Sequence, residues 1–389
     1  SNDIEIINNE GSDWDLFVFA TENPLIEGNK FDNGGLIIVD AGFVGGNLIE
    51  SQNSMIRYNE IKNGVQPGGI DVQGDTLSGG DPVSGNHIIE NNVLDNSGDI
   101  ALYQVKDSFV NKNIILNYGV GFPGYSGFIA IGADNTKNIT FADNIIANGI
   151  GRGIKPETGD KVYGNTIVGL TRNIDPAQGI YGFNAIAEIY NNNICDIEER
   201  GIFLIEGASY FSSITAYNNK VCNSGDYDLY NLLSSSNLTS YDNTCDTTFN
   251  WNDQGETGCT FACQSTDTCP TPNMYSFEAD VIGPACRGDQ AVLKTQYTAT
   301  SQGDYHIKAY YQLENDPSDM WTGPIVDLLA NNIDPGVYIE EHIIGVPNIP
   351  HGNRTINILV VGRGCPTGTP CQPPTPTDFE QKVEFTQQV

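Results

Sequence analysis

The sequence predicts an all-β chain in which a β-solenoid is followed by a small antiparallel β-sandwich. Two observations predict the solenoid: a phrase of Asn, any residue and an apolar residue occurs nine times, and a short apolar run follows most copies. A third observation, a change to longer alternating strands after residue 275, predicts the sandwich. An element that recurs at intervals of roughly 20 to 30 residues, with variable loops between copies, is typical of solenoids.

The repeated phrase marks one turn in each coil. Asn tolerates a left-handed backbone at a turn, and its side-chain amide can hydrogen-bond to an Asn one coil away. We therefore expect a ladder of asparagines along the solenoid. The copies are Asn29-Lys30-Phe31, Asn59-Glu60-Ile61, Asn91-Asn92-Val93, Asn113-Ile114-Ile115, Asn144-Ile145-Ile146, Asn165-Thr166-Ile167, Asn192-Asn193-Ile194, Asn219-Lys220-Val221 and Asn243-Thr244-Cys245.

The apolar runs between these phrases predict strands and not helices. They are short, β-branched or aromatic, and bounded by Gly and Asn. No helical i, i+3, i+4, i+7 stripe is sustained between them. Examples are Gly69-Ile70-Asp71-Val72, Asp99-Ile100-Ala101-Leu102, Gly127-Phe128-Ile129-Ala130, Gly153-Ile154-Lys155 and Gly201-Ile202-Phe203-Leu204.

This pattern resembles the right-handed parallel β-helix repeat proteins, the superfamily of pectate-lyase-like enzymes and surface β-helices. The resemblance covers residues 1–250 and implies a right-handed parallel β-helix there. Residues 251–274 form a Cys-rich junction, and residues 275–389 resemble the Ig-like β-sandwiches of bacterial surface and secreted proteins. This last region includes a Pro/Thr-rich segment, 363–376, and a terminal strand that closes its own sandwich or pairs with a neighbouring subunit. The same coil serves lyases, hydrolases, epimerases, phage tailspikes and adhesins, so the residues must decide the function.

The charge balance excludes two classes of partner. The formal net charge is −31, with 49 acidic against 18 basic residues, which argues against nucleic acid and against anionic membrane surfaces. No apolar stretch is long enough for a transmembrane helix, so we expect no membrane insertion. The acidity suits a soluble extracellular protein, and Ca²⁺ is a candidate cofactor. The chain opens in a strand-like phrase, Asp3 to Asn8, from which we expect a fragment of a longer chain.

Nine cysteines indicate an oxidising compartment, and hence an extracellular or cell-surface location. Cys195 and Cys222 share one offset from the repeat Asn in neighbouring coils, where stacked positions are about 5 Å apart, so we expect them to pair. Cys365 and Cys371 flank a short Pro/Thr segment and are expected to form a second disulfide. No metal site is predicted, because the four histidines are scattered and none lies near the cysteines of the junction.

Candidate site residues come from the outward side of the strands. Alternate residues of a strand face outward, and we take the residue after each Gly as inward. The first outward column is then Asp71, Ala101, Ile129, Lys155, Tyr181 and Phe203. The second, two residues further on, is Gln73, Tyr103, Ile131, Glu157, Phe183 and Ile205.

Aromatic faces with polar groups between them suit sugar rings. We therefore predict ligand binding by Asp71, Tyr103, Glu157, Tyr181 and Phe183. The alternative for the aromatic residues is packing under the long loop 118–126. The alternatives for Lys155 and Asp71 are a surface lysine and a strand-end carboxylate.

Two functions follow from this face. The first is a structural or adhesive cell-surface protein, filament-forming or glycan-binding, whose partners are polysaccharides or other copies of itself. The second is a secreted lyase that cleaves an acidic glycan by β-elimination at a uronate. The resemblance would then make Lys155 the base, with Arg152 or a cation held by Asp71 and Glu157 neutralising the carboxylate. A lysine base must be held neutral by burial or positive neighbours, and Glu157 has the opposite effect. We favour the first function.

Overall fold

A computed structural model of the chain describes residues 4–12, 15–19, 21–33, 35–44, 47–49, 51–64, 69–74, 81–119, 128–207, 212–234, 237–264, 276–282, 290–299, 303–313, 322–333, 336–345, 355–366 and 382–388. The chain divides into two compact units, Ser1–Thr271 and Pro272–Val389. Among the residues that the structure describes, no helix has the length and apolarity that crossing a membrane would require.

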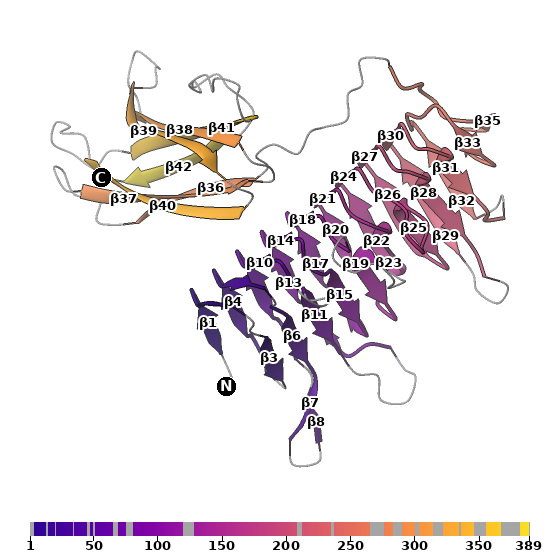
Figure 1. Ribbon diagram of the computed structural model, residues 1–389, viewed down its shortest axis with the longest axis horizontal. Helices are drawn as coiled ribbons and strands as arrows, with labels where there is room; N and C mark the ends of the chain where they lie inside the picture. Colours follow the sequence, from indigo (N-terminus) through magenta and orange to yellow (C-terminus); the bar gives the residue numbers. More distant parts are fainter. Residues whose placement is uncertain are drawn as a thin grey trace. The chain divides into compact units, whose positions relative to one another are not determined.

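The first unit is a parallel β-helix built from three sheets whose strands alternate along the chain (Figure 1). The first sheet consists of β1 (Glu5–Ile7), β4 (Leu25–Glu27), β9 (Met55–Arg57), β13 (Ile88–Glu90), β17 (Phe109–Asn111), β20 (Thr140–Ala142), β23 (Thr158–Tyr163), β26 (Ile186–Tyr190), β29 (Ser213–Tyr217) and β32 (Leu238–Tyr241). The second consists of β2 (Glu10–Ser12), β5 (Lys30–Asp32), β10 (Glu60–Lys62), β14 (Val93–Asp95), β18 (Ile114–Leu116), β21 (Ile145–Ala147), β24 (Thr166–Val168), β27 (Asn193–Cys195) and β30 (Lys220–Cys222).

The predicted catalytic and ligand-binding residues, except Glu157 just before β23 of the first sheet, are carried by the third sheet. It consists of β3 (Leu16–Phe19), β6 (Ile37–Asp40), β11 (Ile70–Gln73), β15 (Ile100–Tyr103), β19 (Ile129–Asp134), β22 (Arg152–Lys155), β25 (Gln178–Phe183), β28 (Arg200–Ile205), β31 (Tyr227–Asn231) and β33 (Thr248–Phe249). Three short pairs complete this unit: β7 (Gly42–Val44) with β8 (Asn47–Ile49), β12 (Ser84–Gly85) with β16 (Val105–Lys106), and β34 (Asn252–Asp253) with β35 (Glu256–Thr257).

The core of the solenoid is a set of in-register apolar columns. In the third sheet, one column places a β-branched or leucine side chain at the same position of six successive strands. All of these side chains are buried, so their outward neighbours are left on the solvent side. The column is Ile100, Ile131, Ile154, Ile180, Ile202 and Leu229.

The predicted asparagine ladder is present. In each step the side-chain NH₂ of one Asn donates to the side-chain oxygen of the Asn in the next coil, at 2.9–3.1 Å. The member in the third phrase is Asn92, and Asn91 is not in the ladder. The left-handed residue of each turn is the one before the ladder Asn, such as Tyr58 and Asn91, and not the ladder Asn itself. The ladder members are Asn29, Asn59, Asn92, Asn113, Asn144, Asn165, Asn192, Asn219 and Asn243, preceded by Asn9.

The predicted Cys195–Cys222 disulfide is wrong, although the two residues do lie opposite each other in β27 and β30. Cys222 is bonded to Cys263, a second disulfide joins Cys245 and Cys259, and Cys195 is also disulfide-bonded. β30 is the last strand of the second sheet. Thr244 bridges to Lys220 at its edge, and Phe261 bridges to Thr244, so the segment after the solenoid stacks on this end and Cys263 bonds to Cys222. The expected Cys365–Cys371 pair lies outside the described side chains.

The second unit consists of two antiparallel sheets. One contains β36 (Ser276–Ile282), β37 (Gln290–Ala299) and β40 (Gly336–Gly345). The other contains β39 (Thr322–Ile333), β38 (Gly303–Leu313), β41 (Thr355–Pro366) and β42 (Lys382–Gln388). The terminal strand β42 pairs with β41 of the same chain. The Ig-like sandwich stays a prediction.

Candidate functional site

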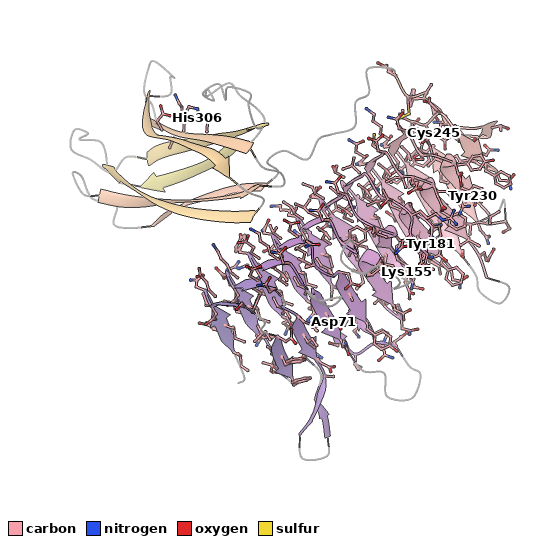
Figure 2. All side chains as sticks on the ribbon, viewed as in Figure 1. Asp71, Lys155, Tyr181, Tyr230, Cys245 and His306 are labelled. Atoms are coloured by element: carbon pink, nitrogen blue, oxygen red, sulfur yellow. A yellow bond between two sulfur atoms is a disulfide. The ribbon has the colours of Figure 1, made fainter. Side chains whose placement is uncertain are left out.

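The candidate site is the outward face of the third sheet from β19 to β33. Because the apolar column of Ile131, Ile154 and Ile180 points into the core, the residues next to it point out. Figure 2 labels Asp71, Lys155, Tyr181 and Tyr230 along this sheet. Their order along the solenoid follows the order of strands β11, β22, β25 and β31.

The structure corrects the predicted columns at β19 and at the end of β22, where Glu157 lies beyond the strand. Ala101 pairs with Gly132, and Gly132 pairs with Lys155, so Gly132 and not Ile129 occupies the first column. Asp134 pairs with Tyr103 and replaces Ile131, which is buried in the core, in the second column. The prediction aligned the coil on Gly127, but the strand takes its register from the residues that enter the core.

Lys155 lies between two carboxylates. Its Nζ is 3.4 Å from Oδ1 of Asp134 and 3.2 Å from Oε1 of Glu157, and its side chain is only 15% exposed. Burial raises the pKa of Glu157, and the charge of Lys155 opposes this increase. Both carboxylates contact the same nitrogen that a base in β-elimination would present to its substrate. Lys155 is therefore a mostly buried, ion-paired residue of this face.

Arg152 is on the same strand as Lys155 but has different partners. Its Nε donates to Oε1 of Gln178 at 3.1 Å, and its terminal nitrogen is 3.7 Å from Oδ1 of Asp175. Its guanidinium lies 4.4 Å from the ring centroid of Tyr181, which is a cation–π distance. Among the predicted site residues, the structure thus brings Arg152 to Tyr181 and Lys155 to Glu157.

A continuous group of aromatic rings extends from β25 to β33. Tyr181 stacks on Phe183 and on Phe203, with ring centroids 5.9 and 5.8 Å apart. Phe203 meets Tyr230 edge to face at 5.3 Å, and Tyr230 stacks on Phe249 at 4.5 Å. We call Tyr181, Phe183, Phe203, Tyr227, Tyr230 and Phe249 the aromatic row. Phe203 is buried under its neighbours, whereas Phe183 is 36% exposed.

A second arginine is part of this row. The guanidinium of Arg200 lies 4.6 Å from the centroid of Phe203 and 4.7 Å from that of Tyr230. Its terminal nitrogen is 4.0 Å from Oδ2 of Asp226. Both arginines of this face therefore combine ring contacts with a carboxylate partner, so the face offers donors, acceptors and apolar surface together.

Asp71 and Tyr103 lie apart from this group. Asp71 is three strands before Lys155, which corresponds to about 14 Å at the usual strand spacing. Asp71 and Glu157 therefore cannot share one cation, and that prediction is wrong. Burial raises the pKa of Asp71, and its Oδ2 accepts a hydrogen bond of 2.5 Å from Gln73. Tyr103 is 40% exposed on β15.

Sequence reasoning missed Asp134, Arg200, Tyr227, Tyr230 and Phe249. A signal for the tyrosines was present, because Asn223-Ser224-Gly225-Asp226 repeats Asn96-Ser97-Gly98-Asp99, which precedes a strand. Asp134 was missed because β19 was placed in the wrong register. Among the described residues, no group of three or more His, Cys, Asp or Glu side chains is arranged to hold a metal ion.

A second set of aromatic rings, on the first sheet, has a different geometry. Tyr163, Tyr190, Tyr217 and Tyr241 stack at 4.9 Å in each step, with interplanar angles of 1–13°. Parallel neighbours at this spacing cover one another's faces, so this tyrosine ladder presents mainly ring edges. In the aromatic row, rings tilted by 60–69° break the parallel stacking and leave faces without a parallel neighbour.

Comparisons with known proteins give a distant likeness to tailspikes. No protein-family model matches the chain, and no curated protein matches it. Tailspike protein 2 of Escherichia coli O157:H7 bacteriophage CAB120 is 10% identical, with a TM-score of 0.29 over 92% of this chain and 61% of that chain. The Dettilon tailspike protein is 9% identical, with a TM-score of 0.20 over 92% of this chain and 86% of that chain. The chain thus spans about three fifths of the length of tailspike protein 2, and the fold assignment rests on the strand pairing.

Proposed function

We propose that the chain is an extracellular or cell-surface β-helix protein that binds a polysaccharide along the outward face of its third sheet, in an adhesive or structural role. The observation that carries the proposal is the aromatic row with its two arginines. From β22 to β33 the face covers four strand spacings, or about 19 Å, which is long enough for several linked sugar rings. The disulfides support an oxidising compartment.

Ring faces and paired charges suit sugars for separate reasons. The C–H face of a sugar packs on an aromatic face, and its hydroxyls need both donors and acceptors nearby. Arg152 and Asp175 supply such groups at one end of the row, and Arg200 and Asp226 supply them near its middle. We prefer binding over cleavage because Lys155, the candidate base, is held by two carboxylates.

The test compares two aromatic residues on different faces of the solenoid, Phe183 on the third sheet and Tyr190 on the first. We expect Phe183→Ala to weaken polysaccharide binding about fivefold, since one ring contact contributes on the order of 1 kcal/mol. The matched control is Tyr190→Ala in the tyrosine ladder, which should bind as wild type. Calorimetric titration with uncharged and uronate-containing polysaccharides measures both variants. Equal loss in the two variants, or no binding by wild type, contradicts the proposal.

The same samples test the lyase alternative. Unsaturated uronate ends absorb in the ultraviolet, so a lyase would increase absorbance with time on a uronate polymer. We expect no increase with wild type. An increase that Lys155→Ala abolishes would make the protein a lyase and overturn the binding-only proposal.

A further inference from the structure

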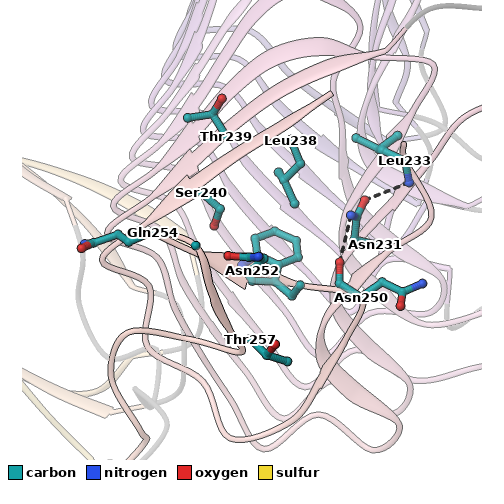
Figure 3. A pocket seen from close by; sticks show the side chains of 11 residues that line it. Asn231, Leu233, Leu238, Thr239, Ser240, Asn250, Asn252, Gln254 and Thr257 are labelled. Carbon is teal, nitrogen blue, oxygen red and sulfur yellow. Dashed lines mark hydrogen bonds between the residues drawn. The ribbon is translucent and has the colours of Figure 1, made fainter. Parts of the chain in front are cut away.

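The solenoid has an open pocket of about 780 Å³ at its C-terminal end (Figure 3). Strands β31 and β32 provide one wall, and the segment from Asn250 to Thr257, which includes β34, provides the other. The pocket is distinct from the aromatic row. Tyr230 and Phe249 belong to the outward face, whereas the residues that follow them, Asn231 and Asn250, line the pocket.

The base of the pocket is apolar. Trp251 and Leu233 are buried in the solenoid core, and Leu238 packs partly against that core. These three side chains form the non-polar part of a pocket whose other lining residues are mostly polar. Such a surface suits the C–H groups of a ligand and does not suit a bare ion.

The described residues that line the pocket are all uncharged. Some of their polar groups are engaged within the protein. Asn231 donates to the carbonyl of Asn250 at 3.0 Å and accepts from the backbone N–H of Leu233 at 2.9 Å. These two bonds hold the wall in place.

Two other polar side chains are available to a ligand. Asn252 and Thr257 form no side-chain hydrogen bond to any residue that the structure describes, and both are exposed. They are cross-strand partners on β34 and β35, so they lie on one side of this hairpin. Figure 3 shows the Asn252 amide between Leu238 and Thr257. Together they offer an amide and a hydroxyl, which are both donors and acceptors.

The nearby carboxylate is not available for a cation. Asp253 accepts hydrogen bonds from Ser240, Asn243, Trp251 and Thr260, so both of its oxygens are occupied. An anion would find no cationic side chain among the lining residues, and the protein carries a formal charge of −31. The chemistry that remains is an uncharged molecule with several hydroxyls and an apolar face.

We propose that this pocket binds an uncharged sugar residue, either a free monosaccharide or the neutral end of a glycan. The ring's C–H face packs against Leu238, and its hydroxyls bind Asn252 and Thr257. This site does not depend on the polysaccharide face of the third sheet, and it adds a second sugar-binding position at the end of the solenoid.

Calorimetric titration with neutral monosaccharides tests the proposal, with the tryptophan fluorescence of the protein, to which Trp251 contributes, as a second readout. The probes are glucose, galactose, mannose and N-acetylglucosamine, with galacturonate as the charged comparison and neutral oligosaccharides for the glycan-end source. We expect saturable binding of at least one neutral sugar and a change in tryptophan emission. Binding of galacturonate alone, or of no sugar, overturns the proposal.

Two threonines provide a matched pair of variants. Thr257 lines the pocket, whereas Thr215 on β29 does not. We expect Thr257→Val and Asn252→Ala each to weaken binding about fivefold, because each removes one hydrogen bond to the sugar, and Thr215→Val to have no effect. Phe183→Ala, which tests the other face, should leave monosaccharide binding unchanged. Equal affinity in wild type, Thr257→Val and Asn252→Ala places the sugar elsewhere and overturns the proposal. An unchanged thermal transition shows that the variants are folded.

Discussion

At the scale of single residues, partners decide what a titratable group can do. Lys155 was predicted as a base from its position in an outward column, and that position is correct. Its chemistry is set by Asp134, which entered the column only through the true register of β19. A sequence pattern can therefore place a residue on a face and still leave its ion-pair partner undecided, because the neighbour across the sheet depends on the register of the next strand.

His87 illustrates the same dependence in the interior. Its ring is buried between two hydroxyls, with Nδ1 3.0 Å from Oγ of Ser54 and Nε2 3.0 Å from Oγ of Ser84. Burial lowers the pKa of His87 to about 4. The unfolded chain, with an ordinary histidine pKa near 6.5, therefore takes up the proton first as the pH falls.

We predict that His87 makes the protein less stable as the pH falls from about 6.5 to about 4. Its contribution is complete above that window, and its loss reaches about 3 kcal/mol at the lower end. Urea unfolding of wild type and His87→Gln across this range measures it. The free energy of unfolding of wild type minus that of the variant should decrease as the pH is lowered. A difference that stays constant across the range would contradict the prediction.

At the scale of elements, the asparagine ladder needs an acceptor at its last step. Each ladder Asn donates its side-chain NH₂ to the next coil, but Asn243 has no further ladder member and donates to Oδ1 of Asp253 at 3.0 Å. The same carboxylate accepts from Trp251 Nε1 at 2.9 Å and from the backbone N–H of Thr260 at 3.1 Å. Burial opposes ionisation, but hydrogen bonds from Ser240, Asn243 and Trp251 outweigh it and lower the pKa of Asp253.

We predict that Asp253→Ala destabilises the solenoid by about 3 kcal/mol, because several buried donors lose their acceptor. The control is Asp226→Ala at the same end, where the carboxylate is exposed and the change should stay within about 0.5 kcal/mol. Because the folded pKa of Asp253 is lowered, its contribution is present above the ordinary aspartate pKa and is lost as the pH falls through the folded value. Equal urea unfolding midpoints for the two variants would argue against a stabilising role of Asp253 as the last acceptor of the asparagine ladder.

The ladder also marks how far sequence reasoning reaches. The periodic Asn and the apolar runs predicted the coils, the ladder and the outward face, because period and burial are local signals. The sequence pattern placed Asn91 in the ladder, but the ladder member is Asn92. Both adjacent asparagines fit the repeated phrase, and only the hydrogen bonds between coils distinguish them. The role of Asp253 as the last acceptor of the ladder could not be predicted from the repeat, because Asp253 lies beyond the last repeated phrase.

At the scale of the molecule, the solenoid couples each coil mainly to its neighbours. The disulfides are placed at one end of it, where Cys222–Cys263 and Cys245–Cys259 hold the segment that covers the last coils. The spacing within the repeat suggested Cys195–Cys222, because both residues have the same offset from the ladder Asn in neighbouring coils. The observed pairing depends on a segment outside the repeat, which spacing within the repeat does not locate.

We predict that reducing these disulfides loosens the C-terminal coils and leaves the earlier coils intact. The bridged positions are 41 and 14 residues apart, and a crosslink across such loops stabilises by about 3–4 kcal/mol in chain-entropy terms. Hydrogen exchange with and without reductant measures the effect coil by coil. Protection should fall in β30 to β35 and persist in β10 to β21, because a linear array transmits a loss at one end only through successive interfaces. A uniform loss of protection would mean that the solenoid unfolds as a single cooperative unit, and the pocket at its C-terminal end would then be as stable as its core.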